Sequence, residues 1–232
     1  GDKNPQPRRA VKGAEDEKRM TLAHIDLFSG IGGFALAAQW AGFTTVAFVE
    51  TEPYARAIIE QNFGALSFAD AERCNGRQNN EGETASERIW FTPRLHGDIR
   101  TFDGTIYRGA TLLTGGFPCQ PFSQAGKRRG KEDDRYLWPE MLRVISEVRP
   151  AWIIGENVAG IVNMELDRVL SDLEGEGYAV QSLVIPACAV DAKHRRDRVW
   201  IVARNGTLGH AGGTGLQGGE RRGVSGEGAR PS

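Results

Sequence analysis

The chain has 232 residues, of which 40% are hydrophobic and 25% are charged, and its formal net charge is −1 at pH 7. This balance excludes a chain that is disordered throughout, and the near-neutral charge argues against a protein that coats nucleic acid non-specifically. No apolar run reaches the roughly 18 residues of a membrane-spanning helix, and the three cysteines lack the spacing of a zinc finger. Because the N-terminal segment 1–20 has no signal-peptide core, a cytoplasmic location is expected.

Short apolar runs alternate with amphipathic segments from Leu22 onwards. The pattern predicts strands at 22–28, 44–50, near Gly97–Ile99, and at 111–116, 151–156, 178–187 and 198–204. It predicts helices at 32–42, 53–64, 137–149 and 166–177. This alternation indicates an α/β fold with a doubly wound, mostly parallel sheet of seven strands. Because no full crossover helix separates the last two strands, one of them is expected to run antiparallel.

Three segments fall outside this pattern. Residues 1–20 are charged and show no periodicity, so we expect a disordered leader before a folded domain at 21–204. Residues 65–95 form a polar insert that is longer than most ordered loops. Residues 205–232 contain ten glycines and almost no large apolar side chains, which predicts a linker that cannot order itself.

A glycine-rich loop follows the first predicted strand. Gly30, Gly32 and Ala35 have the Gly-x-Gly-x-x-Gly/Ala spacing, and Glu50 lies at the end of the next predicted strand. Glycines at these positions allow a tight turn and close approach of the backbone to a ligand, and an acid after the second strand can bind both ribose hydroxyls. The loop therefore predicts a cofactor with an adenosine moiety, either a dinucleotide or S-adenosylmethionine.

A lone cysteine lies between two prolines where the strand at 111–116 ends. Pro118 and Pro121 favour a fixed extended turn around Cys119, at the edge of the sheet where α/β proteins place their chemistry. A thiol presented in this way suits a nucleophile better than a core position. Basic residues follow at 127–135 among glycine and serine, which suggests a lid that closes over a phosphate backbone.

An acid and two arginines complete the set of candidate site residues. Glu156 ends the strand beside the one that carries Cys119, so its carboxylate can point into the same cleft, although Asn157 beside it is also typical of a helix cap. Arg196 and Arg198 lie two positions apart on one face of a strand start. They form either a solvated strand edge or a pair that holds a base, a phosphate or the carboxylate itself.

In this order, these motifs resemble those of the cytosine-5 DNA methyltransferase family. The matching text is DLFSGIGGF, then Glu50, GDI at 97–99, GGFPCQPFS, ENV at 156–158 and the Arg-x-Arg at 196–198. The resemblance spans residues 22–204 and implies a Rossmann-like methyltransferase sheet that is incomplete at its C-terminus. It also implies transfer of a methyl group from S-adenosylmethionine to C5 of cytosine in double-stranded DNA. The setting it implies is a restriction-modification or self-protection system of a bacterial or phage-infected cell.

The resemblance assigns a role to each motif. Cys119 would attack C6 of a flipped-out cytosine, Glu156 in its acid form would stabilise charge at N3, and Arg198, with Arg196 nearby, would contact the base and orient the acid. The cofactor residues would be Phe28, Ser29, Gly30, Ile31, Gly32, Gly33, Glu50, Thr51, Asp98, Ile99, Pro118 and Trp138, with Asp98 at the adenine amino group. DNA contacts would come from Gln120, Ser123, Lys127, Arg128 and Arg129. No metal is expected.

The sequence departs from the family pattern at three points. His194 stands where the family has the first glutamine of a Gln-x-Arg-x-Arg motif, and the insert at 65–95 has no assigned purpose. The family continues, after its last strand, into a target-recognition domain and a segment that returns to the catalytic domain. We therefore expect a fragment, a truncated gene product or half of a split enzyme whose partner is a second polypeptide carrying the recognition domain.

Two other functions compete with an active methyltransferase. A truncated or split subunit would bind cofactor or a partner chain and be inactive alone. A nicotinamide-dependent dehydrogenase would use the same glycine loop, but it explains neither the Pro-Cys-Gln nor the Glu-Asn-Val sequence. Binding of adenosylhomocysteine but not of NAD distinguishes the methyltransferase from the dehydrogenase.

Overall fold

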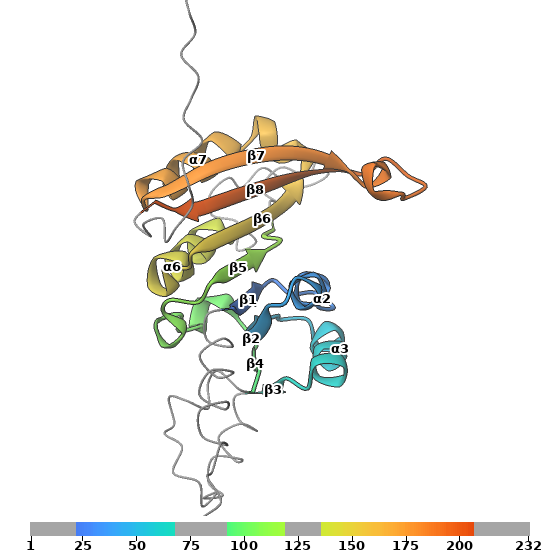
Figure 1. Ribbon diagram of the computed structural model, residues 1–232, viewed down its shortest axis with the longest axis vertical. Helices are drawn as coiled ribbons and strands as arrows, with labels where there is room; N and C mark the ends of the chain where they lie inside the picture. The colour runs from blue at the N-terminus through green and yellow to red at the C-terminus, as the bar shows by residue number, and fades with distance from the viewer. Residues whose placement is uncertain (1–21, 68–91, 119–135, 207–232) are drawn as a thin grey trace, which may run out of the picture.

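One mixed β-sheet forms the centre of the computed structural model, which describes residues 22–67, 92–118 and 136–206. Its eight strands lie in the order β3-β4-β2-β1-β5-β6-β8-β7 (Figure 1). They are β1 (Ala23–Leu27), β2 (Thr44–Val49), β3 (Leu66–Ser67), β4 (Arg94–His96), β5 (Leu112–Gly115), β6 (Trp152–Val158), β7 (Tyr178–Pro186) and β8 (Asp197–Asn205). The α-helices are α2 (Gly33–Trp40), α3 (Pro53–Phe63), α6 (Trp138–Val148) and α7 (Leu166–Gly175). Short 3₁₀ turns are η1 (Ile99–Thr101), η2 (Thr105–Tyr107), η4 (Ala159–Asn163) and η5 (Ala187–Val190).

The sheet is wound in both directions from β1. This strand pairs in parallel with β2 on one side and with β5 on the other, so successive crossovers build the sheet outwards. In the described part of the chain, β8 is the strand that runs against the rest, and it pairs antiparallel with both β6 and β7. The predicted doubly wound α/β sheet with one antiparallel strand is therefore confirmed.

The sheet differs from the prediction of seven strands at the edge that contains β3 and β4. The sheet has eight, because Leu66–Ser67 forms the short strand β3 beside β4. The strand expected near Gly97–Ile99 lies earlier, at Arg94–His96. Asp98 explains the shift, since its side chain accepts the backbone N–H of Arg100 at 3.0 Å and turns the following residues into η1. β3 lies inside the polar segment 65–95 and β4 begins inside it, and residues 68–91 of this segment are outside the described ranges.

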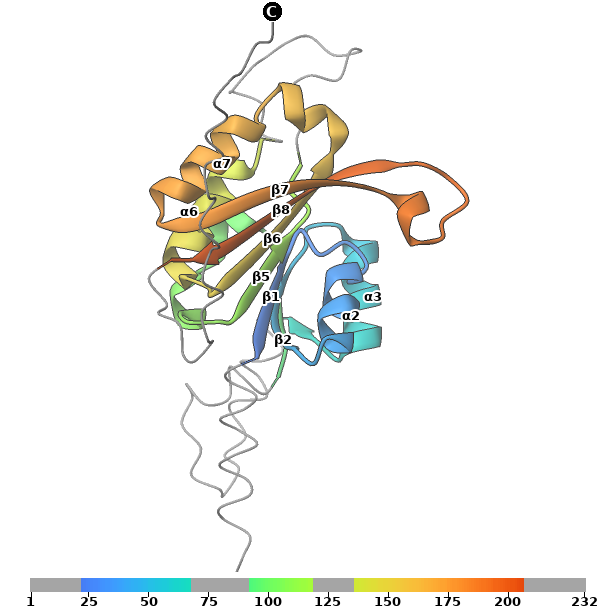
Figure 2. The same cartoon turned by 45° about the horizontal axis from the view of Figure 1, so that its top comes forward.

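Helices cover the two faces of the sheet unequally. α6 and α7 lie against one face, and α2 and α3 lie against the other beside β1 and β2 (Figure 2). On its side of the sheet, α2 packs the ring of Phe34 edge-on against Trp200 of β8, with centroids 5.8 Å apart, but Trp152 of β6 and Leu183 of β7 are exposed there. A cavity of about 310 Å³, lined mostly by apolar residues of α2, β5, β6 and β8, marks the border. None of the helices described is long and apolar enough to cross a membrane.

The helices follow from their sequence patterns. Buried residues at helical spacing in α6 face the main core: Trp138, Met141, Val144, Ile145 and Val148. α3 begins with Pro53 after Glu52, whose side chain accepts the N–H of Ala55 at 2.8 Å, and ends at Gly64 with a φ of 64°. Both ends match the predicted helix at 53–64.

A chain of buried polar side chains crosses the centre of the sheet. His24 on β1 is hydrogen-bonded through Nε2 to Thr114 and through Nδ1 to Thr45, both at 2.8 Å. Thr114 also lies 3.0 Å from Asp26 Oδ1, which extends the hydrogen-bonded chain from Thr45 through His24 and Thr114 to Asp26. Burial lowers the pKa of His24 to about 3 and raises the pKa of Asp26 to about 8. Both side chains are therefore neutral near pH 7.

Candidate active site

A cavity of about 660 Å³ opens where β1, β2, β5 and β6 end. Its lining brings together predicted residues from six separate parts of the sequence: Phe28, Glu50, Thr51, Asp98, Ile99, Pro118, Glu156, Arg196 and Arg198. We call Phe28, Glu50, Thr51, Asp98 and Ile99 the glycine-loop end of the cavity. We call Glu156, Arg196 and Arg198 the acid end. Pro118, the residue before Cys119, lines the same cavity.

Glu50 joins the second strand to the glycine loop at the glycine-loop end. Its Oε2 accepts the N–H of Gly30 at 2.7 Å, and its Oε1 accepts the N–H of Glu52 at 2.8 Å. These two bonds fix the carboxylate in the cavity, and each oxygen keeps a further lone pair for a ligand. The glycine loop and the acid that the sequence pattern assigns to one cofactor site are thus in direct contact through Gly30 and Glu50.

The other loop residues shape the turn rather than line the cavity. Ser29 is buried and donates to the carbonyl of Asp26 at 2.7 Å. Gly32 has a φ of 89°, and a Cβ there would overlap the ring of Phe63, so this position requires glycine. Ile31 is 63% exposed, and neither it nor Gly33 lines the cavity.

A direct ion pair defines the acid end. Arg198 Nε lies 2.6 Å from Glu156 Oε1, and both side chains are about three-quarters buried. A second guanidinium nitrogen of Arg198 donates to the carbonyl of Asp197 at 2.9 Å, which holds the group in place. Arg196 lies just before β8, exposed and with a φ of 36°, so Arg198 belongs to the strand and Arg196 does not. The sequence placed both arginines on one strand face, whereas the left-handed backbone at Arg196 brings it to the cavity from the turn.

Asn157 connects the acid end to the segment that precedes Cys119. Its side chain is buried and donates from Nδ2 to the carbonyl of Phe117 at 2.9 Å, while its Oδ1 accepts the N–H of Val158. It caps no helix: it lies within β6 and fixes the backbone next to Pro118. A Cβ at Gly116 would lie 3.2 Å from Glu156 Oε2, so the glycine leaves room for the acid.

Trp138 lies in the core and does not line the cavity. Its ring packs on Phe117 with centroids 5.0 Å apart, and its indole N–H donates to Asp172 at 2.8 Å. Leu137, which precedes α6, lines the cavity instead. The sequence analysis named neither Leu137 nor the other lining residues Val49, Arg100, Phe117, Asn157 and Val158 as ligand contacts. The signal in the sequence that could have identified them as lining residues is their position within or beside the candidate site residues.

The remaining predicted residues lie outside the described ranges. They are the nucleophile candidate Cys119 and the DNA-contact candidates Gln120, Ser123, Lys127, Arg128 and Arg129. Among the residues that are described, no group of three or more histidine, cysteine or acidic side chains is arranged to bind a metal.

Comparison with known proteins identifies the family. The family model of C-5 cytosine-specific DNA methylase matches residues 22–85 and 87–211. The chain belongs to this family. It is 32% identical over 188 residues to the type II methyltransferase M.NgoMIV of Neisseria gonorrhoeae, a match that covers 79% of this chain and 52% of the relative. It is 36% identical over 193 residues to M.PspPI of Psychrobacter sp. strain TA137, covering 80% and 40%. The chain thus spans about half or less of the length of these curated relatives.

Solved structures support the same fold. The S. pombe Dnmt2 methyltransferase superposes with a TM-score of 0.59 and 23% identity, covering 82% of this chain and 52% of that one. A putative DNA modification methyltransferase from an E. coli prophage gives a TM-score of 0.60 at 23% identity, covering 81% and 48%. The sheet is therefore the Rossmann-like sheet of methyltransferases, as predicted.

Proposed function

We propose that this chain forms the catalytic region of an enzyme that transfers a methyl group from S-adenosylmethionine to C5 of cytosine in duplex DNA. The observation that carries the proposal is the larger cavity, which joins a glycine loop and its acid to the Glu156–Arg198 ion pair and to Pro118. The type II methyltransferases among its relatives favour a role in restriction-modification. This assignment predicts a protein of the bacterial cytoplasm.

The glycine-loop end fits the adenosine part of the cofactor. A volume of about 660 Å³ lies in the range of cofactor pockets. The fixed carboxylate of Glu50 has free lone pairs for ribose hydroxyls, Phe28 and Ile99 offer apolar surface, and Asp98 offers an acceptor for the adenine amino group. When bound, S-adenosylmethionine supplies an electrophilic methyl group.

The acid end suits activation of the cytosine. In the proposed reaction the Cys119 thiolate adds to C6, and the electron pair of the C5–C6 double bond shifts to C5 and, through C4, to N3. Glu156, in its acid form, gives a proton or a hydrogen bond to N3 and so stabilises that charge. Arg198 holds Glu156 in position through the 2.6 Å contact. After C5 has been methylated, its proton leaves to a base, the C6–S bond breaks and the thiolate returns.

A second candidate is a subunit that needs another chain to be active. One observation favours it: Trp152 and Leu183 are exposed on a sheet face that no helix covers at these positions within the described ranges. A second polypeptide with the target-recognition domain would then be the partner.

Transfer of labelled methyl to mixed-sequence duplex DNA tests the proposal, with Cys119→Ala as the blank. We expect incorporation by the wild-type chain, or by the chain mixed with its partner, and none by the variant. The variant keeps its affinity for adenosylhomocysteine, because Cys119 has no part in the proposed cofactor contacts. Incorporation that persists in Cys119→Ala would contradict the mechanism, and saturation by NAD instead of adenosylhomocysteine would favour a dehydrogenase.

A further inference from the structure

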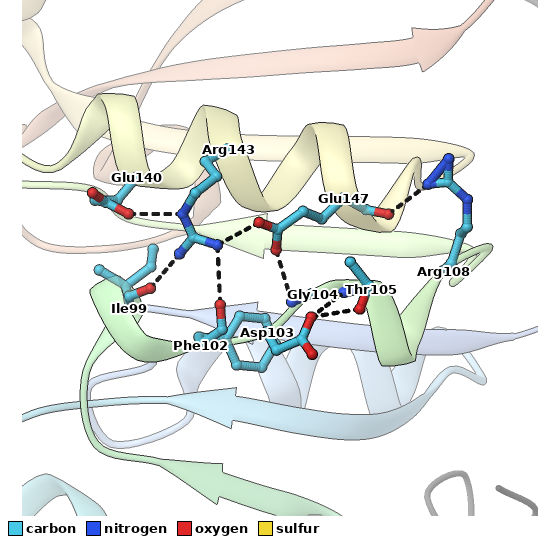
Figure 3. Close-up of polar contacts among 9 residues, drawn as sticks. All are labelled: Ile99, Phe102, Asp103, Gly104, Thr105, Arg108, Glu140, Arg143 and Glu147. Carbon is cyan, nitrogen blue, oxygen red and sulfur yellow. Dashed lines mark hydrogen bonds and ion pairs between the residues drawn. The ribbon is translucent and has the colours of Figure 1, made fainter.

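Arg143 on α6 holds the backbone of the turn that forms part of the glycine-loop end (Figure 3). Its guanidinium donates to the carbonyl of Ile99 at 2.6 Å and to the carbonyl of Phe102 at 3.1 Å. These two carbonyls lie at the start of η1 and just after its end. One side chain from a distant part of the sequence thus binds both ends of a short turn.

The acids on α6 keep Arg143 in this position. Glu140 accepts from Arg143 Nε at 2.9 Å, and Glu147 accepts from a terminal nitrogen at 2.6 Å. Glu147 also accepts the N–H of Gly104 at 2.8 Å through its other oxygen. Burial alone would lower the pKa of Arg143, but the hydrogen bonds to Glu147 and Glu140 outweigh it and raise this pKa. The guanidinium is therefore charged, and near neutral pH the two acids hold it in place.

The turn that Arg143 holds carries two lining residues of the cavity. Asp98 caps η1 and Ile99 begins it, and both line the cavity, while Arg143 itself does not. A small rotation of η1 would move the Asp98 carboxylate and the backbone of Ile99 together. Since the carbonyls face α6 and the lining atoms face the cavity, the contact with Arg143 fixes the orientation of the turn.

We propose that Arg143 is a positioning residue that sets the selectivity of the cavity for a 6-aminopurine. The inference rests on the proposed function, in which Asp98 accepts the adenine amino group. Arg143 acts through η1, so its loss changes how well Asp98 is aligned with that group. Arginine is required because a planar guanidinium donates in two directions to two carbonyls while it binds two acids, which a lysine ammonium does less well.

The experiment compares binding of two ligands to the 232-residue chain by calorimetry. One is adenosylhomocysteine, and the other is its 6-oxo analogue, S-inosylhomocysteine, which lacks the amino group. For Arg143→Met we expect about tenfold weaker binding of adenosylhomocysteine and a clearly smaller loss for the analogue, because the lost alignment concerns the amino group. The ratio of the two affinities therefore falls by about threefold or more. Arg143→Lys keeps the charge between the acids and is measured in parallel, in case the methionine variant does not fold.

Arg108→Met is the matched control. Arg108 also links the segment after η1 to α6, through a bond to the carbonyl of Glu147 at 3.0 Å, but it touches neither Ile99 nor Phe102. Its loss is expected to leave the affinity ratio unchanged. Near-ultraviolet circular dichroism checks that each variant is folded.

The outcomes separate the inference from the proposed function. If the wild-type chain does not bind adenosylhomocysteine, the proposed function is contradicted and the inference falls with it. If the wild-type chain prefers the amino ligand and the folded Arg143 variants lose affinity for both ligands equally, or lose none, the inference alone is overturned. A fall in the ratio for Arg143→Met or Arg143→Lys, absent in Arg108→Met, supports it.

Discussion

The two ends of the cavity are built in different ways. At the glycine-loop end, Glu50 accepts two backbone N–H groups and Asp98 accepts that of Arg100, whose exposed guanidinium adds a longer contact of 3.5 Å, so the backbone does most to fix these carboxylates. At the acid end, Glu156 and Arg198 hold one another through a side-chain ion pair between two strands. Backbone fixation suits a site that binds one ligand in one way, whereas an ion pair can exchange one partner for a substrate. The difference indicates that one substitution can weaken cofactor binding and another can slow methyl transfer, each without the other effect.

Removing the acid is expected to have the largest effect and to act on chemistry alone. Glu156→Ala deletes the group proposed to stabilise charge at N3 and leaves Arg198 without its partner. We expect methyl transfer to fall by about 10²–10³-fold, as for loss of other groups that stabilise developing charge. The rate of labelled methyl incorporation is the measurement, and Glu174→Ala on the exposed side of α7 is the control. A similar loss of adenosylhomocysteine affinity would show that the two ends are not independent.

Altering the glycine-loop acid is expected to act on binding alone. Glu50→Gln removes the charge and one of the two acceptors for Gly30 and Glu52. We expect adenosylhomocysteine to bind about tenfold more weakly, with the transfer rate at saturating cofactor little changed. Calorimetry measures the affinity. Glu52→Gln, which alters only the cap of α3, should bind as the wild type does; equal losses in both variants would rule out a specific role for Glu50.

The hydrogen bond from Asn157 to the carbonyl of Phe117, which joins the acid end to the segment before Cys119, predicts a smaller effect on methyl transfer. Asn157→Ala leaves the buried carbonyl of Phe117 without its donor, so the backbone before Pro118 loses its anchor. We expect methyl transfer to fall by about tenfold and the free energy of unfolding to fall by about 1–3 kcal/mol, with cofactor affinity kept. Unfolding in urea and single-turnover transfer measure the two effects. Unchanged transfer in a destabilised but folded variant would reduce Asn157 to a structural residue.

The buried polar chain of His24, Thr114 and Asp26 predicts that the free energy of unfolding changes with pH while cofactor binding stays intact. Between pH 3 and 6.5 the folded state holds fewer protons at His24 than the unfolded state does, which makes stability rise with pH. Between pH 3.8 and about 8 it holds more protons at Asp26, which makes stability fall with pH. His96, whose pKa burial lowers to about 4, adds a slope of the same sign as His24. The histidine and aspartate slopes oppose one another up to about pH 6.5, and above that the slope of Asp26 dominates.

The free energy of unfolding is therefore expected to fall by about 1 kcal/mol between pH 6.5 and pH 8, because the last protons leaving His24 and His96 in the unfolded state offset part of the fall at Asp26. Asp26→Asn still accepts from Thr114 and no longer titrates, so its stability should not fall over the same interval. Urea unfolding at the two pH values checks this. An equal fall in the variant would assign the slope to another group.

The sequence predicted the elements whose pattern is local. β1, β2 and β5 are short, mostly apolar or β-branched segments, and each lies within the range predicted for it. β4 was misplaced because a strand of Arg-Leu-His shows no apolar run, and only the fold reveals that Arg94 is buried. The motif residues Glu50, Asp98 and Glu156 line one cavity, since the ends of parallel strands meet at one edge of the sheet, while their roles stay predictions.

No local sequence pattern identifies the residues that bind distant backbone atoms. Arg143 and Asn157 bind carbonyls that are far away in the sequence, and no spacing rule connects them. The choice between Leu137 and Trp138 depends on where α6 begins, because the first helical residue turns inward and the one before it faces the cavity. Arg196 reaches the cavity through a positive φ that arginine rarely adopts.

The antiparallel direction of β8 limits which insertions and deletions this family member can tolerate. Arg198 lies opposite Val158 and reaches Glu156 diagonally, so its contact depends on the register of β8 against β6. A shift by a single position would bring Asp197 or Val199 to that place and put either a second acid or an apolar side chain beside Glu156. A one-residue insertion or deletion within β8 is therefore expected to break the contact between Arg198 and Glu156, whereas the turn between β7 and β8 can vary in length before Arg196. Natural variants should accordingly differ in the turn and keep the distance from Arg198 to the end of β8 constant.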